Sequence, residues 1–177
     1  GYRTSRFKSS DAGKYLITGI RLLLYRTFKP NLAYKGLAEE LSSMGINEPV
    51  AQQVCEAVVR IRQRKLPNPN TVGNAGSFFK NPVVGRETAD LLASEFPGLP
   101  VYSAGDNAKV SAAWMIEHCG WKGRSMGRAA VSEQHALVLI NKGHATGGEI
   151  LALAKAIQDS VKKRFDIELQ TEPIIIR

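Results

Sequence analysis

The sequence predicts an α+β fold in which a small antiparallel or mixed sheet packs against helices. Four stretches carry apolar residues at helical spacing, and four others are short apolar runs of the strand type. These stretches follow one another without a regular strand–helix–strand period, which favours segregated helices and strands over a doubly wound parallel sheet. The 177 residues, 44% of them apolar, are enough to bury a core.

Each expected element is based on a local pattern. Asn47 and Pro49 supply an N-cap and an early-turn proline for a helix over 50–65, whose last turns are basic, as suits the helix dipole. Further helices are expected over 86–96, 109–119 and 149–164. The last of these places five apolar residues on one stripe: Ile150, Leu151, Ala154, Ile157 and Val161. Strands are expected over 15–24, 136–141, 165–169 and 173–177.

Composition narrows the classes of function. The net charge of +8 suits phosphate-rich partners, so a nucleic-acid-binding domain is one alternative, but the chain lacks the motifs of such modules. No run approaches the ~20 apolar residues of a membrane span. Cys55 and Cys119 are not spaced as the ligands of a metal ion, and the three histidines share no metal-binding pattern. We therefore expect two half-buried free thiols and no metal site.

The stretch 66–85 does not fit the regular pattern. It holds three Pro, three Gly and four Asn in twenty residues, together with Phe78 and Phe79. A long irregular loop that contains buried-type aromatic residues is seldom a mere connector, so this loop is the candidate site. Glycines before Ser77 let the backbone approach a ligand closely. From the residues alone, the alternative is a glycine turn with a capping serine.

One string in this loop is specific. GNAGSFFKNP, preceded by RKLPNP, resembles the signature of the UDP-N-acetylenolpyruvoylglucosamine reductase family. The resemblance continues in GYRTSRFK, NLAYKGL, AAWMIEHCGWKG, ALVLIN and LQTEPIII, in the family's order, and covers nearly the whole chain. A ten-residue string with further landmarks in order is a far more specific signal than one short motif.

The resemblance implies a reaction and residues for it. In this family NADPH reduces a bound FAD, and the reduced flavin passes a hydride to the enolpyruvyl β-carbon of UDP-N-acetylglucosamine enolpyruvate, giving UDP-N-acetylmuramate for peptidoglycan. Ser77 is the implied proton donor to the α-carbon, and Arg3 and Glu172 are implied to be catalytic with it. The implied substrate contacts are Tyr34, Lys65, Asn81, Tyr102, Lys109 and His135.

These residue types suit that chemistry. Hydride addition pushes negative charge onto the α-carbon and its carboxylate, and the cations of Arg3 and Lys65 can stabilise that charge. A serine hydroxyl can protonate a strongly basic carbanion in a desolvated pocket. His135 stands where some family members have glutamine and can donate the same hydrogen bond with added pH sensitivity. Ile174 stands where members often have arginine.

The resemblance also implies a longer protein, because the FAD-binding loops of the family precede the GYRxSxFK string. We expect residues 1–30 to be the tail of the FAD-binding domain, 31–165 the substrate-binding domain, and 166–177 C-terminal strands that carry Glu172. The implied protein is a bacterial cytoplasmic flavoprotein of cell-wall biogenesis, and hence of cell shape and division. We expect this chain alone to be inactive and to retain neither FAD nor NADPH. The alternative is a non-catalytic nucleotide-sugar-binding module.

Overall fold

The computed structural model describes residues 5–34 and 36–175 and has the expected α+β fold, with helices and small antiparallel sheets. The chain divides into two compact units, Gly1–Val59 and Arg60–Arg177. The division falls within helix α2 (Ala51–Lys65), which matches the helix expected after Asn47 and Pro49. Arg3, one of the residues expected to be catalytic, lies outside the described residues.

The first unit contains a single-turn 3-10 helix, η1 (Arg6–Lys8), the short helix α1 (Leu37–Ser43) and most of α2. Helix α1, which the sequence pattern did not reveal, buries Leu37 and Leu41. In α2 the buried residues Ala57 and Ile61 are one helical turn apart. Cys55 lies on another face of α2 and is exposed, so the expectation of a half-buried thiol is wrong for Cys55; Cys119 is half-buried.

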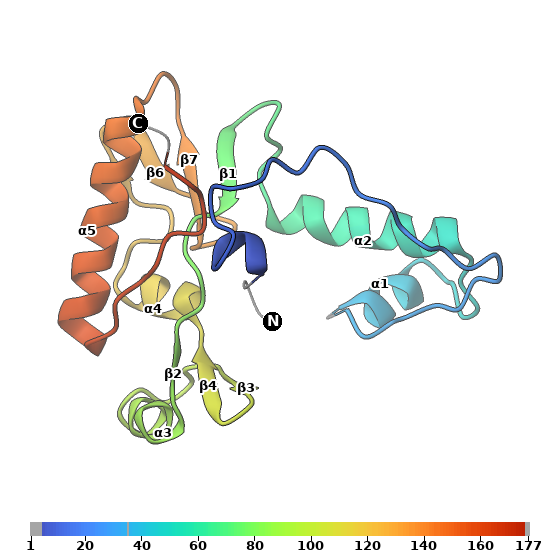
Figure 1. Cartoon of the computed structure of the whole chain (residues 1–177), viewed down its shortest axis with the longest axis horizontal. Coiled ribbons are helices and arrows are strands. Elements are labelled where there is room, and N and C mark those ends of the chain that lie inside the picture. The colour runs from blue at the N-terminus through green and yellow to red at the C-terminus, as the bar shows by residue number, and fades with distance from the viewer. Residues whose placement is uncertain (1–4, 35, 176–177) are drawn as a thin grey trace. The chain divides into compact units, whose positions relative to one another are not determined.

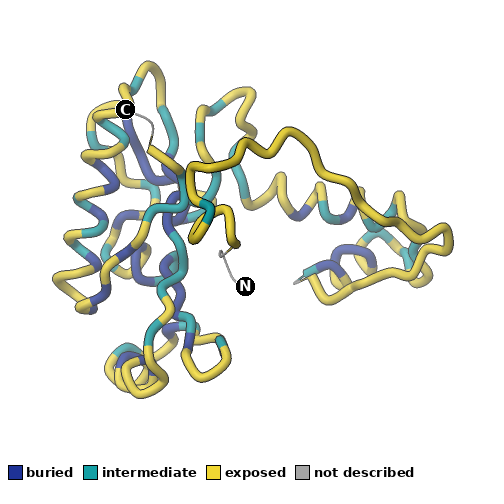
Figure 2. Tube along the Cα trace, viewed as in Figure 1, coloured by how far each residue is buried: buried dark blue, intermediate teal, exposed yellow. Residues whose placement is uncertain are grey.

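The segment 15–24 forms no strand, contrary to the sequence prediction. Its apolar side chains stand in solvent, with Leu16 87% and Leu23 89% exposed, and it runs as an extended trace (Figures 1 and 2). A strand needs a neighbour for its backbone hydrogen bonds, and no described strand pairs with this segment. Apolar, β-compatible composition therefore predicts a strand only where the fold provides a partner.

The second unit contains two antiparallel sheets (Figure 1). The four-stranded sheet has the order β1 (Gly73–Ser77), β7 (Val138–Asn141), β6 (Ala129–Val131) and β5 (Ser125–Met126). The three-stranded sheet has the order β2 (Val83–Gly85), β4 (Asn107–Val110) and β3 (Val101–Ala104). Strand β7 confirms the core of the expected strand 136–141.

Three helices pack in the second unit, two of them against these sheets. Helix α5 (Gly147–Phe165) packs against β6 and β7, α3 (Arg86–Glu95) packs against β2 and β4, and α4 (Ala112–His118) packs against α5. Helix α5 begins with a capping box, in which the Thr146 hydroxyl accepts from the Glu149 backbone N–H and the Glu149 carboxylate accepts from the Thr146 backbone N–H.

The core lies between α5, α4 and the four-stranded sheet, with Met115, Leu153 and Ile157 fully buried. The buried stripe of α5 differs from the expected one, because Leu153 and Phe165 are buried in addition, Ile150 is only half-buried and Leu151 is not buried. Leu151 is 39% exposed and Leu153 is 0% exposed. The sheet fixes which face of the helix is covered, and Leu153 lies one turn before Ile157 on that face, whereas Leu151 does not.

Three further expectations are corrected. Residues 165–169 form no strand, because Phe165 still belongs to α5 and Asp166 ends that helix in the left-handed conformation at φ 54°. Residues 173–175 also form no strand, and 176–177 lie outside the described residues. The helix expected from Lys109 begins at Ala112 instead, because Ala108 and Val110 alternate inward as residues of β4.

Candidate functional site

The stretch 66–85, expected to be an irregular loop, contains strands β1 and β2. In β1, Asn74 pairs with Ile140 and Ser77 pairs with Val138, so β1 has one more residue than β7 between the two pairs. Gly76 lies within this bulge at φ +70°, a conformation that glycine adopts without strain. A bulge redirects the side chains beside it, and here it precedes the half-buried Ser77.

Past Ser77, the chain is held on both sides by backbone hydrogen bonds. On one side the Phe78 N–H donates to the Leu137 carbonyl at 2.7 Å. On the other, the Glu172 N–H donates to the Phe78 carbonyl and the Lys80 N–H donates to the Gln170 carbonyl, both at 2.9 Å. Phe79 itself forms a bridge with Thr171 and is 1% exposed.

This pairing brings the backbone of Glu172 to the segment that follows Ser77, although the two residues lie far apart in the sequence. Glu172 is directly opposite Phe78, the residue that follows Ser77. The Oε2 atom of Glu172 is buried. The alternating apolar residues Ile167 and Leu169 are buried ahead of it, so they anchor the segment that carries Glu172 to the core.

His135 lies in the turn that leads into β7 and is fixed by that turn. The Leu137 N–H donates to Nδ1 of His135 at 3.2 Å, and the Val138 N–H donates to the His135 carbonyl at 3.0 Å. Because Nδ1 accepts a hydrogen bond, the neutral imidazole carries its proton on Nε2, which makes Nε2 a donor. Val138, at the end of this turn, pairs with Ser77.

Burial and the nearby charges together lower the pKa of His135. Partial burial lowers its pKa below the usual 6.5, and the positive charges of Lys122 and Lys65 lower it further, while the negative charge of Glu117 acts in the opposite direction. Lys65, the last residue of α2, is therefore close enough to His135 for its charge to be felt. Two expected substrate contacts, Lys65 and His135, therefore lie close enough to interact electrostatically, beside the ion pair that Lys122 forms with Glu117 at 2.9 Å.

Three other expected substrate contacts belong to the three-stranded sheet or its connection. Tyr102 of β3 pairs with Lys109 of β4, and the Lys109 ammonium lies 5.6 Å from the centroid of the Tyr102 ring, a cation–π arrangement. The side-chain oxygen of Asn81 accepts from the Ala112 N–H at 2.9 Å and so holds the start of α4. Asn81 follows Ser77 on the segment that joins the two sheets.

Tyr34 belongs to the first unit, where it is 45% exposed and its carbonyl accepts from the Leu37 N–H at 3.0 Å.

The residues that sequence reasoning missed are those that surround the expected ones. Asn74 has a local signal, since an asparagine two residues before a glycine is typical of an Asx turn. Glu117 and Lys122 have none, because only the fold places them beside His135.

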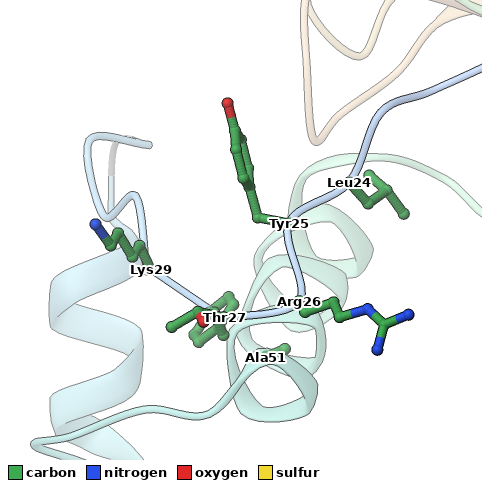
Figure 3. A pocket seen from close by; sticks show the side chains of 7 residues that line it. Leu24, Tyr25, Arg26, Thr27, Lys29 and Ala51 are labelled. Carbon is green, nitrogen blue, oxygen red and sulfur yellow. The ribbon is translucent and has the colours of Figure 1, made fainter.

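A large hollow in the first unit contains none of the described candidate residues. It measures about 1040 Å³ and is lined by residues 24–29 and Ala51. In Figure 3 the side chains of Tyr25 and Arg26 point in different directions rather than converging on one point. Leu24 and Tyr25 are 79% and 87% exposed. This open surface therefore has the character of an uncovered apolar segment rather than of a catalytic pocket.

The described residues lack two kinds of feature. Residues 5–34 and 36–175 contain no group of three or more His, Cys, Asp or Glu arranged to hold a metal ion. Within the same residues, no helix has the length and apolar character needed to cross a membrane.

Comparison with known proteins gives consistent matches. The family model described as UDP-N-acetylenolpyruvoylglucosamine reductase, C-terminal domain, matches residues 68–176. The reductase of that name from Paraburkholderia xenovorans (strain LB400) is 46% identical over 179 residues, which cover 99% of this chain and 52% of the relative. The one from Xylella fastidiosa (strain M12) is 47% identical over 177 residues, which cover 99% of this chain and 50% of the relative.

A solved structure, the UDP-N-acetylenolpyruvylglucosamine reductase of Thermus caldophilus, aligns with 71% of this chain and 35% of its own, at a TM-score of 0.43 and 23% identity. The chain spans about half the length of the curated relatives that it matches.

Proposed function

Because the chain belongs to the UDP-N-acetylenolpyruvoylglucosamine reductase family, as its sequence predicts, we propose that it is the C-terminal, substrate-binding part of such a reductase. The complete protein would reduce UDP-N-acetylglucosamine enolpyruvate to UDP-N-acetylmuramate with NADPH and FAD. The bacterial relatives carry the reductase name, and the family model covers the part of this chain that contains both Ser77 and Glu172.

The observation that carries this proposal is the backbone pairing around Phe78. It gathers Ser77, the turn of His135 and the segment of Glu172 at one edge of the four-stranded sheet. This edge therefore carries a hydroxyl, a carboxylate and an imidazole, the types of group that proton transfer uses. The alternative, a glycine turn with a capping serine, is not supported, because among the described residues no hydrogen bond from the Ser77 hydroxyl to the backbone of a turn is found.

The residues of this chain would act on the proton side of the reaction. When bound, the reduced flavin supplies the hydride that adds to the β-carbon of the enolpyruvyl group. The carbon–carbon double bond thereby becomes a single bond, and the electron pair moves to the α-carbon, where the adjacent carboxylate spreads the charge. Ser77 then donates its hydroxyl proton to the α-carbon and regains a proton from solvent. Arg3 and Glu172 are the proposed catalytic partners of Ser77.

The cationic groups of the second unit suit an anionic substrate. Lys65 and the Nε2–H donor of His135 would contact the negatively charged part of the substrate near Ser77. Tyr102 and Lys109 present a ring and an ammonium group side by side, which fits a nucleoside diphosphate. Asn81, whose side-chain oxygen is committed to α4, has its amide NH₂ group as the donor for a substrate contact. Tyr34 is the proposed contact from the first unit.

The FAD is assigned to the part of the full-length protein that this chain does not span. A dinucleotide cradle needs glycine-rich backbone that is open to the pyrophosphate. The glycine-rich residues Gly73–Ser77 pair with β7 instead and surround the bulge before Ser77. We extend the proposal to the domains: residues 1–30 as the tail of the FAD-binding domain, 31–165 as the substrate-binding domain and 166–177 as the segment of Glu172. The exposed apolar side chains at 15–24 support the first assignment.

The test is the Ser77→Ala variant in a full-length reductase that contains this chain. Stopped-flow absorbance separates flavin reduction by NADPH from flavin reoxidation by the enolpyruvyl substrate. We expect reduction to be unchanged and reoxidation to slow by ~10²–10⁴, the usual contribution of a general acid. Ser160→Ala is the matched control, because Ser160 is half-buried like Ser77 and its hydroxyl donates to the Ala156 carbonyl within α5.

Equal slowing of both half-reactions would contradict the role of Ser77. Unchanged reoxidation in Ser77→Ala would contradict it as well. Binding of a UDP-sugar by the parent protein without any flavin reoxidation by the enolpyruvyl substrate would support the alternative, a nucleotide-sugar-binding module without catalysis.

A further inference from the structure

We propose that Asn74 is a positioning residue for Ser77, which it serves by holding the bulge of β1 in shape. The inference depends on the proposed function, since it assumes that Ser77 donates the proton. Asn74 is half-buried, and no step of the mechanism above uses it. It acts on the backbone around Ser77 rather than on the substrate.

Three hydrogen bonds of the Asn74 amide carry the proposal. Its Oδ1 accepts from the Gly76 N–H at 3.0 Å. Its Nδ2 donates to the Val72 carbonyl at 2.9 Å and to the Pro67 carbonyl at 3.4 Å. The one side chain therefore holds the residue before Ser77, the start of β1 and the segment that follows α2. An amide is needed for this, because the contacts require both an acceptor and two donor hydrogens.

The bond to Gly76 bears directly on the geometry at Ser77. Gly76 is the positive-φ residue of the bulge and precedes Ser77, so a rotation at Gly76 displaces the Ser77 hydroxyl. Gly76 lies in the bulge and has no paired residue on β7, and its backbone N–H donates to the side chain of Asn74. Without it, the Gly76 amide must find water, and the bulge gains access to other glycine conformations.

The bond to Pro67 connects a second part of the site. Pro67 follows Lys65 by two residues, and Lys65 is the cation whose charge reaches His135. Asn74 thus ties the end of α2 to β1, so the distance between the Lys65 backbone and the Ser77 backbone is set partly by one side chain. A reaction of this kind is sensitive to such placement, since a displacement of about 1 Å costs about 100-fold in rate.

The test uses three variants in a full-length reductase that contains this chain. Asn74→Ala removes all three bonds, Asn74→Asp keeps the acceptor for Gly76 but not the donors, and Asn70→Ala is the control, an exposed asparagine of the same segment. We expect Asn74→Ala to slow flavin reoxidation about 10- to 100-fold without changing flavin reduction by NADPH. We expect Asn74→Asp to be slowed by less, and Asn70→Ala to match the parent.

A double-mutant cycle separates positioning from general structural damage. Because Asn74 acts through Ser77, Asn74→Ala should slow the Ser77→Ala protein by less than about 3-fold. Slowing of the Ser77→Ala protein by the same factor as the parent would overturn the proposal. So would equal rates for Asn74→Ala and the parent, while a normal rate for Ser77→Ala itself would instead defeat the proposed function.

A second readout needs no catalysis. In this chain, hydrogen exchange of the Gly76 amide should accelerate at least about 10-fold in Asn74→Ala and stay near the parent rate in Asn74→Asp. If Asn74→Ala does not fold, Asn74→Asp decides alone. A protected Gly76 amide with reoxidation within about 10-fold of the parent supports positioning through Gly76. A protected amide with reoxidation as slow as in Ser77→Ala overturns it.

Discussion

Replacing Phe79 with alanine should sharply destabilise the second unit. Phe79 is 1% exposed, its ring lies 5.4 Å from that of Phe78 in an edge arrangement, and its backbone bridges to Thr171. Truncating a buried phenylalanine to alanine costs ~3–5 kcal/mol, from lost apolar transfer energy and the cavity left behind. This is a large fraction of the ~5–15 kcal/mol that holds an ordinary domain together.

Urea denaturation followed by tryptophan fluorescence measures this loss. Both tryptophans of the chain, Trp114 and Trp121, belong to the second unit, so their signal reports on that unit. With a urea m-value of about 2 kcal/mol/M, the loss corresponds to a midpoint lower by about 1.5–2.5 M. Phe28→Ala is the control, since Phe28 is 43% exposed and lies in the first unit.

A midpoint shift for Phe79→Ala below about 0.5 M, or one equal to that of Phe28→Ala, would mean that the Phe79 side chain adds little to the core. The pairing of residues 78–80 with 170–172 would then need another source of stability.

Two further predictions concern His135 and the start of α5. The pKa of His135 is lowered in the folded state, so as the pH falls the unfolded chain binds a proton at this residue before the folded chain does. The free energy of unfolding should therefore fall as the pH drops below about 6.5, and it should fall less in His135→Gln. Parallel plots of unfolding free energy against pH for the two proteins would contradict the lowered pKa. Thr146→Ala should lower the free energy of unfolding by ~1 kcal/mol because the capping box is lost, whereas Thr146→Ser should retain most of the stability of the parent. Equal urea midpoints for Thr146→Ala and Thr146→Ser would count against the cap.

The family and the α+β class followed from the sequence because both depend on local residue order. The GNAGSFFKNP string and the strings around it identify the family that the family model and the relatives confirm. Helical spacing located α2, α3 and α5 to within a few residues, since a helix makes its hydrogen bonds within itself. The site residues that the resemblance assigns stay predictions, for which the Ser77→Ala experiment is the first test.

Strands were predicted less well because each depends on a partner elsewhere in the chain. The apolar segment 15–24 has strand composition but no partner strand among the described residues, and it stays extended and exposed. In contrast, the glycine-rich residues of β1 have poor strand propensity, and pairing with β7 makes them a strand nonetheless. Short strands such as β5 and β6 carry too few residues for a period to be visible.

By itself, then, the sequence determined the family, the fold class, the three longest helices and the types of residue available for chemistry. Only the tertiary structure decided which of these residues meet. The hydrogen bonds of Phe78 place Glu172 opposite the residue that follows Ser77, and the fold places Lys122 and Lys65 close enough to lower the pKa of His135. Such contacts join residues far apart in the chain, and their formation depends on the packing of whole elements, which no local pattern records.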